Sequence, residues 1–222
     1  VKDAKDGLLA LSRTSLKAHA PQLVGIVGQV GSGKSTMLAA ILGEVKVLAG
    51  QAAVEGSLAY VGQHPFIRNA SLRDNVLFGL PWDEGRYRAT VKACALRPDF
   101  RALPHGDHTI IGEKGITLSG GQKARVGLAR AVYSDADVYL LDDPLSAVDA
   151  HVGKVLFEQC VRGMLRTKCV IMVTNALQYL NVFDAIYVLK DGRVAASGSF
   201  ADLSARPTGP FHALMQANAE TL

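Results

Sequence analysis

The sequence feature that most limits the fold of this chain is a glycine-rich segment, residues 28–36, here called the phosphate loop. It reads Gly28, Gln29, Val30, Gly31, Ser32, Gly33, Lys34, Ser35, Thr36. The segment fits the pattern G-x-x-x-x-G-K-[ST]. An apolar run long enough for one buried strand precedes it (22–27), and a helix-forming run follows it (37–42) and ends at Gly43. An ordinary turn entering a helix is the alternative, but the complete pattern in this context predicts nucleoside triphosphate binding.

Each type of residue that the pattern requires has a physical task. Glycines let successive backbone N–H groups point at one spot, and the N-terminus of the following helix adds positive potential. Lys34 is placed to reach the β- and γ-phosphates, and the hydroxyl of Ser35 is placed to ligate Mg²⁺. ATP and Mg²⁺ are therefore the expected cofactors.

Composition supports a folded globular chain. Of 222 residues, 49% are hydrophobic and 20% are charged. The net charge of +4 suits an anionic ligand, but Lys and Arg are dispersed, so no nucleic-acid partner is expected. Three cysteines without metal-type spacing indicate a reduced, cytosolic chain. No apolar run has the length of a membrane span, and Val1 resembles neither a signal peptide nor a natural start, so a piece of a longer protein is expected.

The order of elements predicts an α/β fold. Apolar runs at 138–141, 169–173 and 185–189 read as strands separated by helical stretches, which is typical of βαβ units and a mainly parallel sheet. Short strands are expected before residue 19 and within 45–59, and one of the latter is expected to end at residues 60–63. Helices are expected at 71–78, at 83–103 with an interruption at Pro98, at 120–133 and at 211–220. We expect one domain, residues 1–222, with a helical insert at about 83–131.

Two carboxylates follow one of the predicted strands. Asp142 and Asp143 come directly after the apolar run 138–141, at the strand end where α/β sheets place ligands. Asp142 would hold Mg²⁺, and Asp143 would orient or deprotonate the attacking water. A solvated strand end would also explain the pair, but its place downstream of a phosphate loop favours the functional interpretation.

A second anion-binding pattern occurs at 118–122, here called the signature segment. It reads Leu118, Ser119, Gly120, Gly121, Gln122 and opens a predicted helix, whose N-terminus attracts anions. Because a second phosphate site within one domain would be redundant, this one is expected to face the nucleotide of a partner domain. A plain N-capped helix remains the alternative.

Taken in order, these motifs resemble the nucleotide-binding domain of an ABC transporter. The resemblance covers nearly the whole chain and includes Gln63, the signature segment, Asp142-Asp143 and 146–149. Residues 66–79, 111–115 and 142–153 look like the first such domain of a subfamily C, multidrug-resistance-associated protein. The resemblance implies a P-loop NTPase core with a mainly parallel sheet, an N-terminal antiparallel β part and a helical subdomain that bears the signature segment.

The resemblance also implies roles and partners. Two nucleotide-binding domains would sandwich two ATP molecules, so that Ser119, Gly120, Gly121 and Gln122 touch nucleotide bound mainly by the other domain. Gln63 would contact Mg²⁺ and water. The segment from Phe66 to Asn75 would receive the coupling helices of the transmembrane domains. Glu113 would lie near the same interface, and Asp149 would reach the opposite domain.

Three departures from the family pattern affect function. Asp143 stands where active sites have Glu, and misplacement of a catalytic group by about 1 Å can cost on the order of a hundredfold in rate. Asn175 stands at the switch-histidine position and has no cationic form. No Phe, Tyr or Trp that could stack on adenine precedes Tyr60. Either the chain begins just past the stacking aromatic, which we favour, or base binding is weaker and relies on apolar side chains. Trp82 is interpreted as packing.

The predicted function is therefore a Mg·ATP-binding domain of an exporter, with slow turnover at its own site and an intact signature segment that completes the partner's site. The alternative is a regulatory ATP-binding domain of a channel or channel-regulating member. A soluble ABC ATPase of repair or translation fits residues 66–79 less well, and a small-molecule kinase has no use for the signature segment. We expect location at the cytoplasmic face of a membrane within a transporter, and a soluble monomer for the isolated chain.

Overall fold

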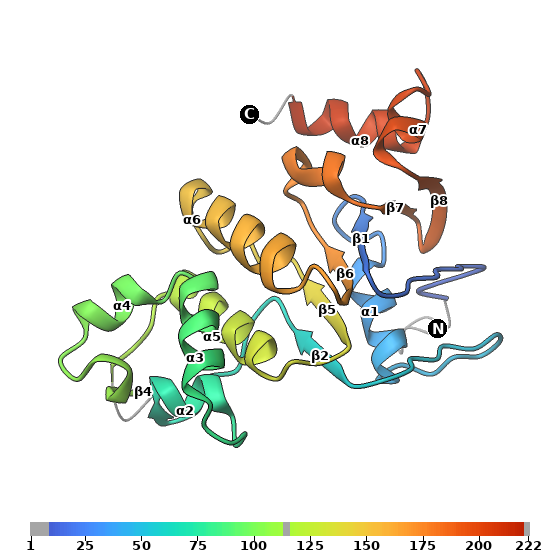
Figure 1. The fold of residues 1–222 in the computed structure, drawn as a ribbon. Helices are drawn as coiled ribbons and strands as arrows, with labels where there is room; N and C mark the ends of the chain where they lie inside the picture. The colour runs from blue at the N-terminus through green and yellow to red at the C-terminus, as the bar shows by residue number, and fades with distance from the viewer. Residues whose placement is uncertain (1–8, 113–115, 220–222) are drawn as a thin grey trace.

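A six-stranded sheet forms the centre of the molecule and is covered by helices on both faces (Figure 1). The computed structural model describes residues 9–112 and 116–219. The strand order is β2-β5-β6-β1-β7-β8, and all neighbours are parallel except β7 and β8. The strands are β1 (Gln22–Val27), β2 (Leu58–Val61), β5 (Val138–Asp142), β6 (Cys169–Val173), β7 (Ala185–Lys190) and β8 (Arg193–Gly198). The predicted α/β class with a mainly parallel sheet is confirmed.

The two faces of the sheet pack against different helices because side chains alternate along each strand. In β6, Val170 and Met172 join the apolar cluster that contains Tyr133 of helix α5 (Gly120–Tyr133). The intervening Ile171 and Val173 join a second cluster, with residues of α1 (Lys34–Leu42). The first face is also covered by α6 (Ala150–Val155) and its π-helical continuation η2 (Leu156–Met164). β6 is buried along its whole length and therefore reads as an unbroken apolar run.

A segment that begins at about residue 70, before the predicted helical insert, and runs to residue 111 lies to one side of the sheet (Figure 1). It contains a short antiparallel pair, β3 (Ala70–Ser71) and β4 (Ile110–Ile111), with α2 (Leu72–Leu77), α3 (Glu84–Ala93), α4 (Arg97–Ala102) and a 3₁₀ turn, η1 (Gly106–His108). The predicted interruption at Pro98 is wrong. The break falls at Ala95, whose φ is +51°, and Pro98 lies in the first turn of α4, where its missing N–H costs no hydrogen bond.

Of the short strands predicted near the N-terminus, only the last, which the sequence predicts to end within 60–63, is formed, as β2. Apart from a single bridge at Leu9, the described residues 9–21 contain no strand, and residues 43–57 contain none. Gly50 and Gly56 interrupt the second segment with φ values of +81° and +92°. Antiparallel pairing in the described residues occurs instead between β7 and β8 and between β3 and β4.

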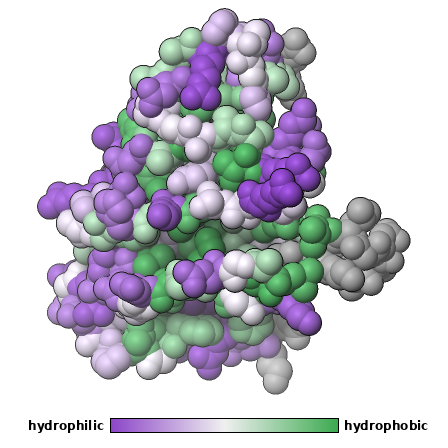
Figure 2. All heavy atoms as spheres, turned by 90° about the vertical axis from the view of Figure 1, so that its right-hand side faces the viewer, coloured by the Kyte–Doolittle hydropathy of each residue, from purple (hydrophilic) through white to green (hydrophobic). Residues whose placement is uncertain are grey.

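A cavity of about 970 Å³ lies between these strandless segments and α1. Its apolar lining includes Leu16, Met37 and Ile41. It also touches Val138 and Cys169, the first residues of β5 and β6, so it lies at the strand ends opposite to Asp142. Figure 2 shows this side of the molecule, where apolar surface runs between more polar regions.

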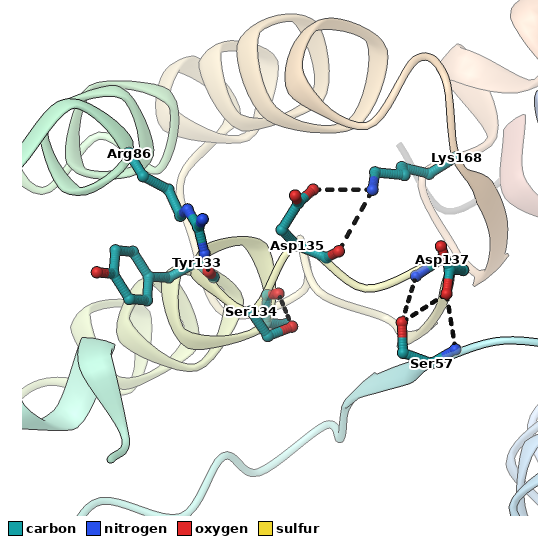
Figure 3. A network of polar contacts seen from close by, with 8 residues as sticks. Ser57, Arg86, Tyr133, Ser134, Asp135, Asp137 and Lys168 are labelled. Atoms are coloured by element: carbon teal, nitrogen blue, oxygen red, sulfur yellow. Dashed lines mark hydrogen bonds and ion pairs between the residues drawn. The ribbon is translucent and has the colours of Figure 1, made fainter. Parts of the chain in front are cut away.

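A polar network fixes β2 at the edge of the sheet (Figure 3). The carboxylate of Asp137, directly before β5, accepts hydrogen bonds from the backbone N–H of Ser57 at 2.8 Å and from its hydroxyl at 2.7 Å. Beside it, Lys168 pairs with Asp135 at 2.8 Å. These contacts hold the start of β2 against the start of β5. They accompany a parallel register in which Leu58 lies opposite Val138.

The chain ends with short helices over the β7–β8 side of the sheet. They are η3 (Leu177–Val182), α7 (Phe200–Ser204) and α8 (Pro210–Ala219), the last of which confirms the helix predicted at 211–220 within one residue. Phe200 and Phe211 meet edge to face at 5.8 Å between ring centroids. Within residues 9–112 and 116–219, no helix is both long and apolar enough to span a bilayer.

Candidate nucleotide site

The phosphate loop joins β1 directly to α1. β1 ends at Val27, and α1 begins at Lys34 after Gly33, which adopts a left-handed conformation with φ +101°. Val30 at the loop tip is 96% exposed, whereas Ser32 is buried and its hydroxyl has no hydrogen-bond partner among the described residues. Buried polar atoms are normally hydrogen-bonded. The orphaned hydroxyl and the helix N-terminus therefore fit a loop shaped around an anion.

The side chain of Lys34 folds back over the loop. Its Nζ donates hydrogen bonds to the carbonyl oxygens of Gly28 at 2.7 Å and Gln29 at 2.9 Å. Burial lowers the pKa of Lys34, and the attraction of Asp143 and Asp142 acts in the opposite direction. The ammonium group thus lies between the loop and two carboxylates, where it can neutralise added negative charge.

Asp142 and Ser35 meet at the end of β5. The Ser35 hydroxyl is hydrogen-bonded to the carboxylate of Asp142, which is 5% exposed. Burial raises the pKa of Asp142; the bond from Ser35 and the charge of Lys34 oppose this, and the charge of Asp143 adds to it. Carboxylate and hydroxyl oxygens are ligands that Mg²⁺ prefers. These two groups therefore fit a magnesium ion, which would supply charge neutralisation next to the phosphate loop.

Asp143 lies directly beyond β5, in a turn. Its φ is +49°, and its carbonyl oxygen accepts from the Ser146 hydroxyl at 2.8 Å. Its carboxylate is buried, with 6% exposure of the residue, and Asn175 contacts it from the loop after β6. The Asn175 side-chain Nδ2 donates to Oδ2 of Asp143 at 2.8 Å, and the Asn175 backbone N–H donates to Oδ1 at 3.3 Å. The two positions that depart from the family pattern are thus in direct contact.

Gln63 lies in the loop after β2, at the same end of the parallel strands as the two aspartates. β2 and β5 are parallel, with Val61 opposite Leu141. Because the carboxyl ends of parallel strands share one edge, the Gln63 loop leaves the sheet beside Asp142. Gln63 itself is exposed. The sheet therefore brings the phosphate loop, Gln63, Asp142, Asp143 and Asn175 to one edge, as the sequence predicts.

The signature segment forms the N-terminus of α5. The Ser119 hydroxyl accepts from the backbone N–H of Gln122 at 3.2 Å, while the Gln122 side chain accepts from the Ser119 N–H at 2.8 Å. This reciprocal capping box satisfies two backbone donors at the helix start. Ser119 and Gly120 are exposed, Gly121 and Gln122 are half-buried, and Leu118 is buried. Glu113 lies outside the described residues.

Helix α5 packs very closely on two loops of the candidate site. A Cβ atom on Gly121 would lie 2.8 Å from the carbonyl oxygen of Ala147, in the loop after Asp143. A Cβ atom on Gly127 would lie 2.5 Å from the Cβ of Pro65, in the loop that carries Gln63. Both glycines are needed for these approaches. The helix that presents the signature segment is therefore in contact with the loops after β2 and β5.

Two residues near the signature segment are not indicated by any sequence motif. The carboxylate of Asp99, in α4, accepts from Gln122 Nε2 at 2.9 Å and from Arg125 Nη2 at 2.8 and 2.7 Å. Asp99 lies 23 residues before Gln122 and belongs to a different helix. Only the tertiary packing of α4 on α5 reveals the contact.

Comparison of the sequence with known proteins shows the family of the chain. The sequence profile of the ABC transporter family matches residues 11–146, more than half of the chain. The chain therefore belongs to the ABC transporter family, whose membership implies ATP binding.

Similar proteins show which ABC subfamily the chain belongs to. The chain is 50% identical over 202 residues to ABC transporter C family member 3 of Dictyostelium discoideum, covering 91% of this chain and 14% of the relative. It is 53% identical over 202 residues to multidrug resistance protein mrp-7 of Caenorhabditis elegans, covering 90% and 13%. It is 50% identical over 192 residues to ATP-binding cassette sub-family C member 4 of Mus musculus, covering 86% and 14%. It is thus an ABC domain of the subfamily C, multidrug-resistance-associated type, and spans only 13–14% of the length of these relatives.

Proposed function

We propose that this chain is the first of two Mg·ATP-binding domains of an exporter of the multidrug-resistance-associated type. In this proposal its own phosphate loop binds ATP and hydrolyses it slowly or not at all. Its signature segment completes the ATP site of the partner domain, where turnover occurs. ATP held at the slow site stabilises the sandwich of the two domains.

The contact between Asn175 and Asp143 is the observation that carries the low-turnover site. Asp143 is one methylene shorter than the glutamate of active family members, and its Oδ2 accepts a hydrogen bond from Asn175. An amide holds no cationic form that could stabilise transition-state charge. The candidate base is therefore short, buried and bonded to a neutral neighbour.

The groups that support binding of Mg·ATP are separate from the positions at which active family sites have glutamate and histidine. Lys34 and the orphaned Ser32 hydroxyl lie at the phosphate loop, and Ser35 and Asp142 offer magnesium ligands. When Mg²⁺ is bound, it neutralises phosphate charge. Gln63 would contact this ion and the attacking water. Binding and turnover thus depend on different residues, so the site can bind ATP without hydrolysing it rapidly.

The partner role is supported by the state of the signature segment. Its capping box is complete, and Ser119 and Gly120 are exposed at the helix N-terminus, where an anion can approach. We propose that Ser119, Gly120, Gly121 and Gln122 contact the ATP that is bound by the second domain. The sandwich forms with that unlike domain, so the isolated chain is expected to be monomeric.

The attachment to a membrane is proposed through the segment from Phe66 to Asn75. Phe66 is 68% exposed, and Asn75 is fully buried with its side chain bonded to the backbone of Arg68. An exposed aromatic on a braced loop suits a docking site for coupling helices of transmembrane domains. In this proposal the domain lies at the cytoplasmic face of a membrane.

A second candidate function is ATP-dependent regulation of a channel. The same Asn175–Asp143 contact supports it, because a site that binds ATP without rapid turnover can control a gate. The two candidates differ in whether the intact protein moves solute against a gradient. Transport by vesicles that contain the intact protein favours the exporter, whereas ATP-gated passive flux favours the channel.

Two substitutions test the proposal in the intact protein. Ser119→Arg should abolish ATP turnover at the partner's site and leave Mg·ATP binding at residues 28–36 unchanged. Lys34→Ala should remove ATP from the phosphate loop, while turnover at the partner's site persists at a reduced rate. Equal turnover at both sites of the unaltered protein, measured by trapping the products of hydrolysis at each, would contradict the proposal.

A further inference from the structure

Both ends of the Gln122 side-chain amide are fixed. Its Oε1 accepts from the backbone N–H of Ser119 at 2.8 Å, and its Nε2 donates to Asp99 Oδ1 at 2.9 Å. A carboxylate can only accept hydrogen bonds, so the Nε2 end of the amide must face Asp99. One Nε2 hydrogen and one Oε1 lone pair remain for a ligand at the helix start. Asp99 thus determines which atoms of Gln122 are offered there.

The carboxylate of Asp99 that holds Gln122 is largely buried and is paired with Arg125. The side chain of Asp99 is 11% exposed and that of Arg125 is 13% exposed. Arg125 Nη2 lies between both carboxylate oxygens, at 2.8 and 2.7 Å, whereas its buried Nε has no hydrogen-bond partner among the described residues. An unsatisfied buried donor is costly. Arg125 is therefore oriented toward Asp99 at the expense of its own full hydrogen bonding.

The charge of Arg125 resolves an electrostatic conflict. A carboxylate near a helix N-terminus reduces the positive potential that would attract a phosphate. Arg125, one turn into α5, pairs with Asp99 and offsets its charge. The pair can then hold Gln122 without repelling an anion at the exposed start of the helix.

We infer that Asp99 is a positioning residue for the partner's ATP site: it orients the amide of Gln122, and Arg125 neutralises it. The inference rests on the proposed function of the signature segment. The carboxylate of Asp99 also joins α4 to the signature segment.

The test uses ATP turnover by the intact transporter that contains this domain, with kcat and KM for ATP measured separately. Asp99→Ala should lower kcat about tenfold, since small misplacement of a group that contacts the reacting phosphate has effects of this size or larger. Asp99→Asn should recover part of that loss, because its Oδ1 can still accept from Gln122. Mg·ATP binding at residues 28–36 should be unchanged in both variants.

Asp107 provides the matched control. It is a similarly buried carboxylate of the same helical insert, 15% exposed, and pairs with Arg73 at 2.9 Å. Asp107→Ala and Asp107→Asn should lower the melting temperature as much as the Asp99 variants do and leave kcat within about twofold. If the Asp107 variants lose as much turnover as the Asp99 variants, the effect is a general loosening of the insert and the inference is wrong.

Ser119→Arg separates this inference from the function on which it rests. If Ser119→Arg abolishes turnover but Asp99→Ala retains it within about twofold, Asp99 does not position Gln122 and the proposed function stands. If Ser119→Arg itself leaves turnover intact, the proposed function fails and this inference fails with it. Asp99→Asn, which preserves the side-chain shape, serves where Asp99→Ala does not fold.

Discussion

Asn175 donates a side-chain hydrogen bond to the carboxylate of Asp143 at 2.8 Å, and its backbone N–H donates a second one at 3.3 Å. The two residues come from the ends of neighbouring parallel strands, β5 and β6. They are also the two positions proposed to replace the catalytic glutamate and the switch histidine of active family sites. The departures therefore form a single structural unit, in which each residue is the polar partner of the other.

Asn175→Asp should destabilise the isolated domain at neutral pH. The variant places a second carboxylate against Asp143, and two like charges about 4 Å apart cost between about 1 kcal/mol in water and about 4 kcal/mol at a partly buried site. The pKa of one member of the pair would rise above its ordinary value of about 3.9, so the loss of stability should be complete at pH 7, shrink as pH falls through the raised pKa, and be gone near pH 4. Thermal unfolding between pH 3.5 and 7 measures this.

Asn175→Ala is the control for that substitution. It removes the hydrogen bond without adding charge and should cost about 1 kcal/mol with little dependence on pH. If Asn175→Asp is no less stable than Asn175→Ala at pH 7, the two side chains do not face each other as described.

Asp142→Asn should raise the melting temperature of the ligand-free domain at neutral pH. Burial raises the pKa of Asp142 above its ordinary value, so the ionised form weakens folding. This penalty is complete above the folded pKa and disappears as pH falls toward the unfolded value near 3.8. The gain from Asp142→Asn should therefore shrink on acidification. A relief of about 1 kcal/mol corresponds to about 2–4 °C in a chain of this size.

Added Mg·ATP should reverse the order of stability of the unaltered domain and Asp142→Asn. Mg·ATP should raise the melting temperature of the unaltered domain more than that of Asp142→Asn, since Asp142 would hold the ion. Equal stabilisation of both proteins by Mg·ATP would show that Asp142 is not a magnesium ligand.

Gly121→Ala should destabilise the domain by about 1–3 kcal/mol, a range typical of overpacking. Its Cβ would approach the Ala147 carbonyl oxygen to 2.8 Å and force α5 away from that loop. Gly120→Ala is the matched control, because nothing lies within 4 Å of its Cβ position. Denaturant unfolding of the two variants should differ by at least about 1 kcal/mol, and equal stability would contradict the close packing of α5.

Arg130→Met should cost about 1–3 kcal/mol. Arg130 Nε donates to the carbonyl oxygen of Asn75 at 2.9 Å, and its guanidinium lies 4.2 Å from the ring centroid of Phe78. These contacts connect α5 to the segment proposed to receive the transmembrane domains. Arg88→Met is the control; it removes an exposed pair with Glu84 and should cost less than about 0.5 kcal/mol. Denaturant unfolding that found similar losses for the two would contradict the structural role of Arg130.

Local sequence patterns were sufficient to predict the bounds of several core helices and strands. β1, β6 and α5 match their predicted bounds because apolar strand runs, and the Ser119 cap of α5, act within a few residues. The predicted helix break failed because proline suits the first turn of a helix, and the chain turned at Ala95 instead. The predicted N-terminal strands failed because a strand needs a neighbour, which residues 9–21 and 43–57 do not find within the described chain.

The candidate site, like the fold, could be predicted from the sequence only in part. The sequence motifs identified the phosphate loop, both aspartates and the signature segment, since each is a short run with its own chemistry. The bond between Asn175 and Asp143 spans 32 residues and depends on the register of β5 and β6. The contact of Asp99 with Gln122 depends on how two helices pack. Such distances are set by the tertiary structure and could not be predicted from spacing alone.

The most direct test of the slow-site account is ATP turnover by this domain mixed with its partner domain, beside the Asn175→His, Asp143→Glu double variant. The account predicts tight Mg·ATP binding with negligible turnover at the unaltered phosphate loop, and partial recovery of turnover there in the double variant. Brisk hydrolysis at the unaltered loop would show that Asp143 and Asn175 are sufficient for catalysis. It would contradict the proposed asymmetry between the two sites.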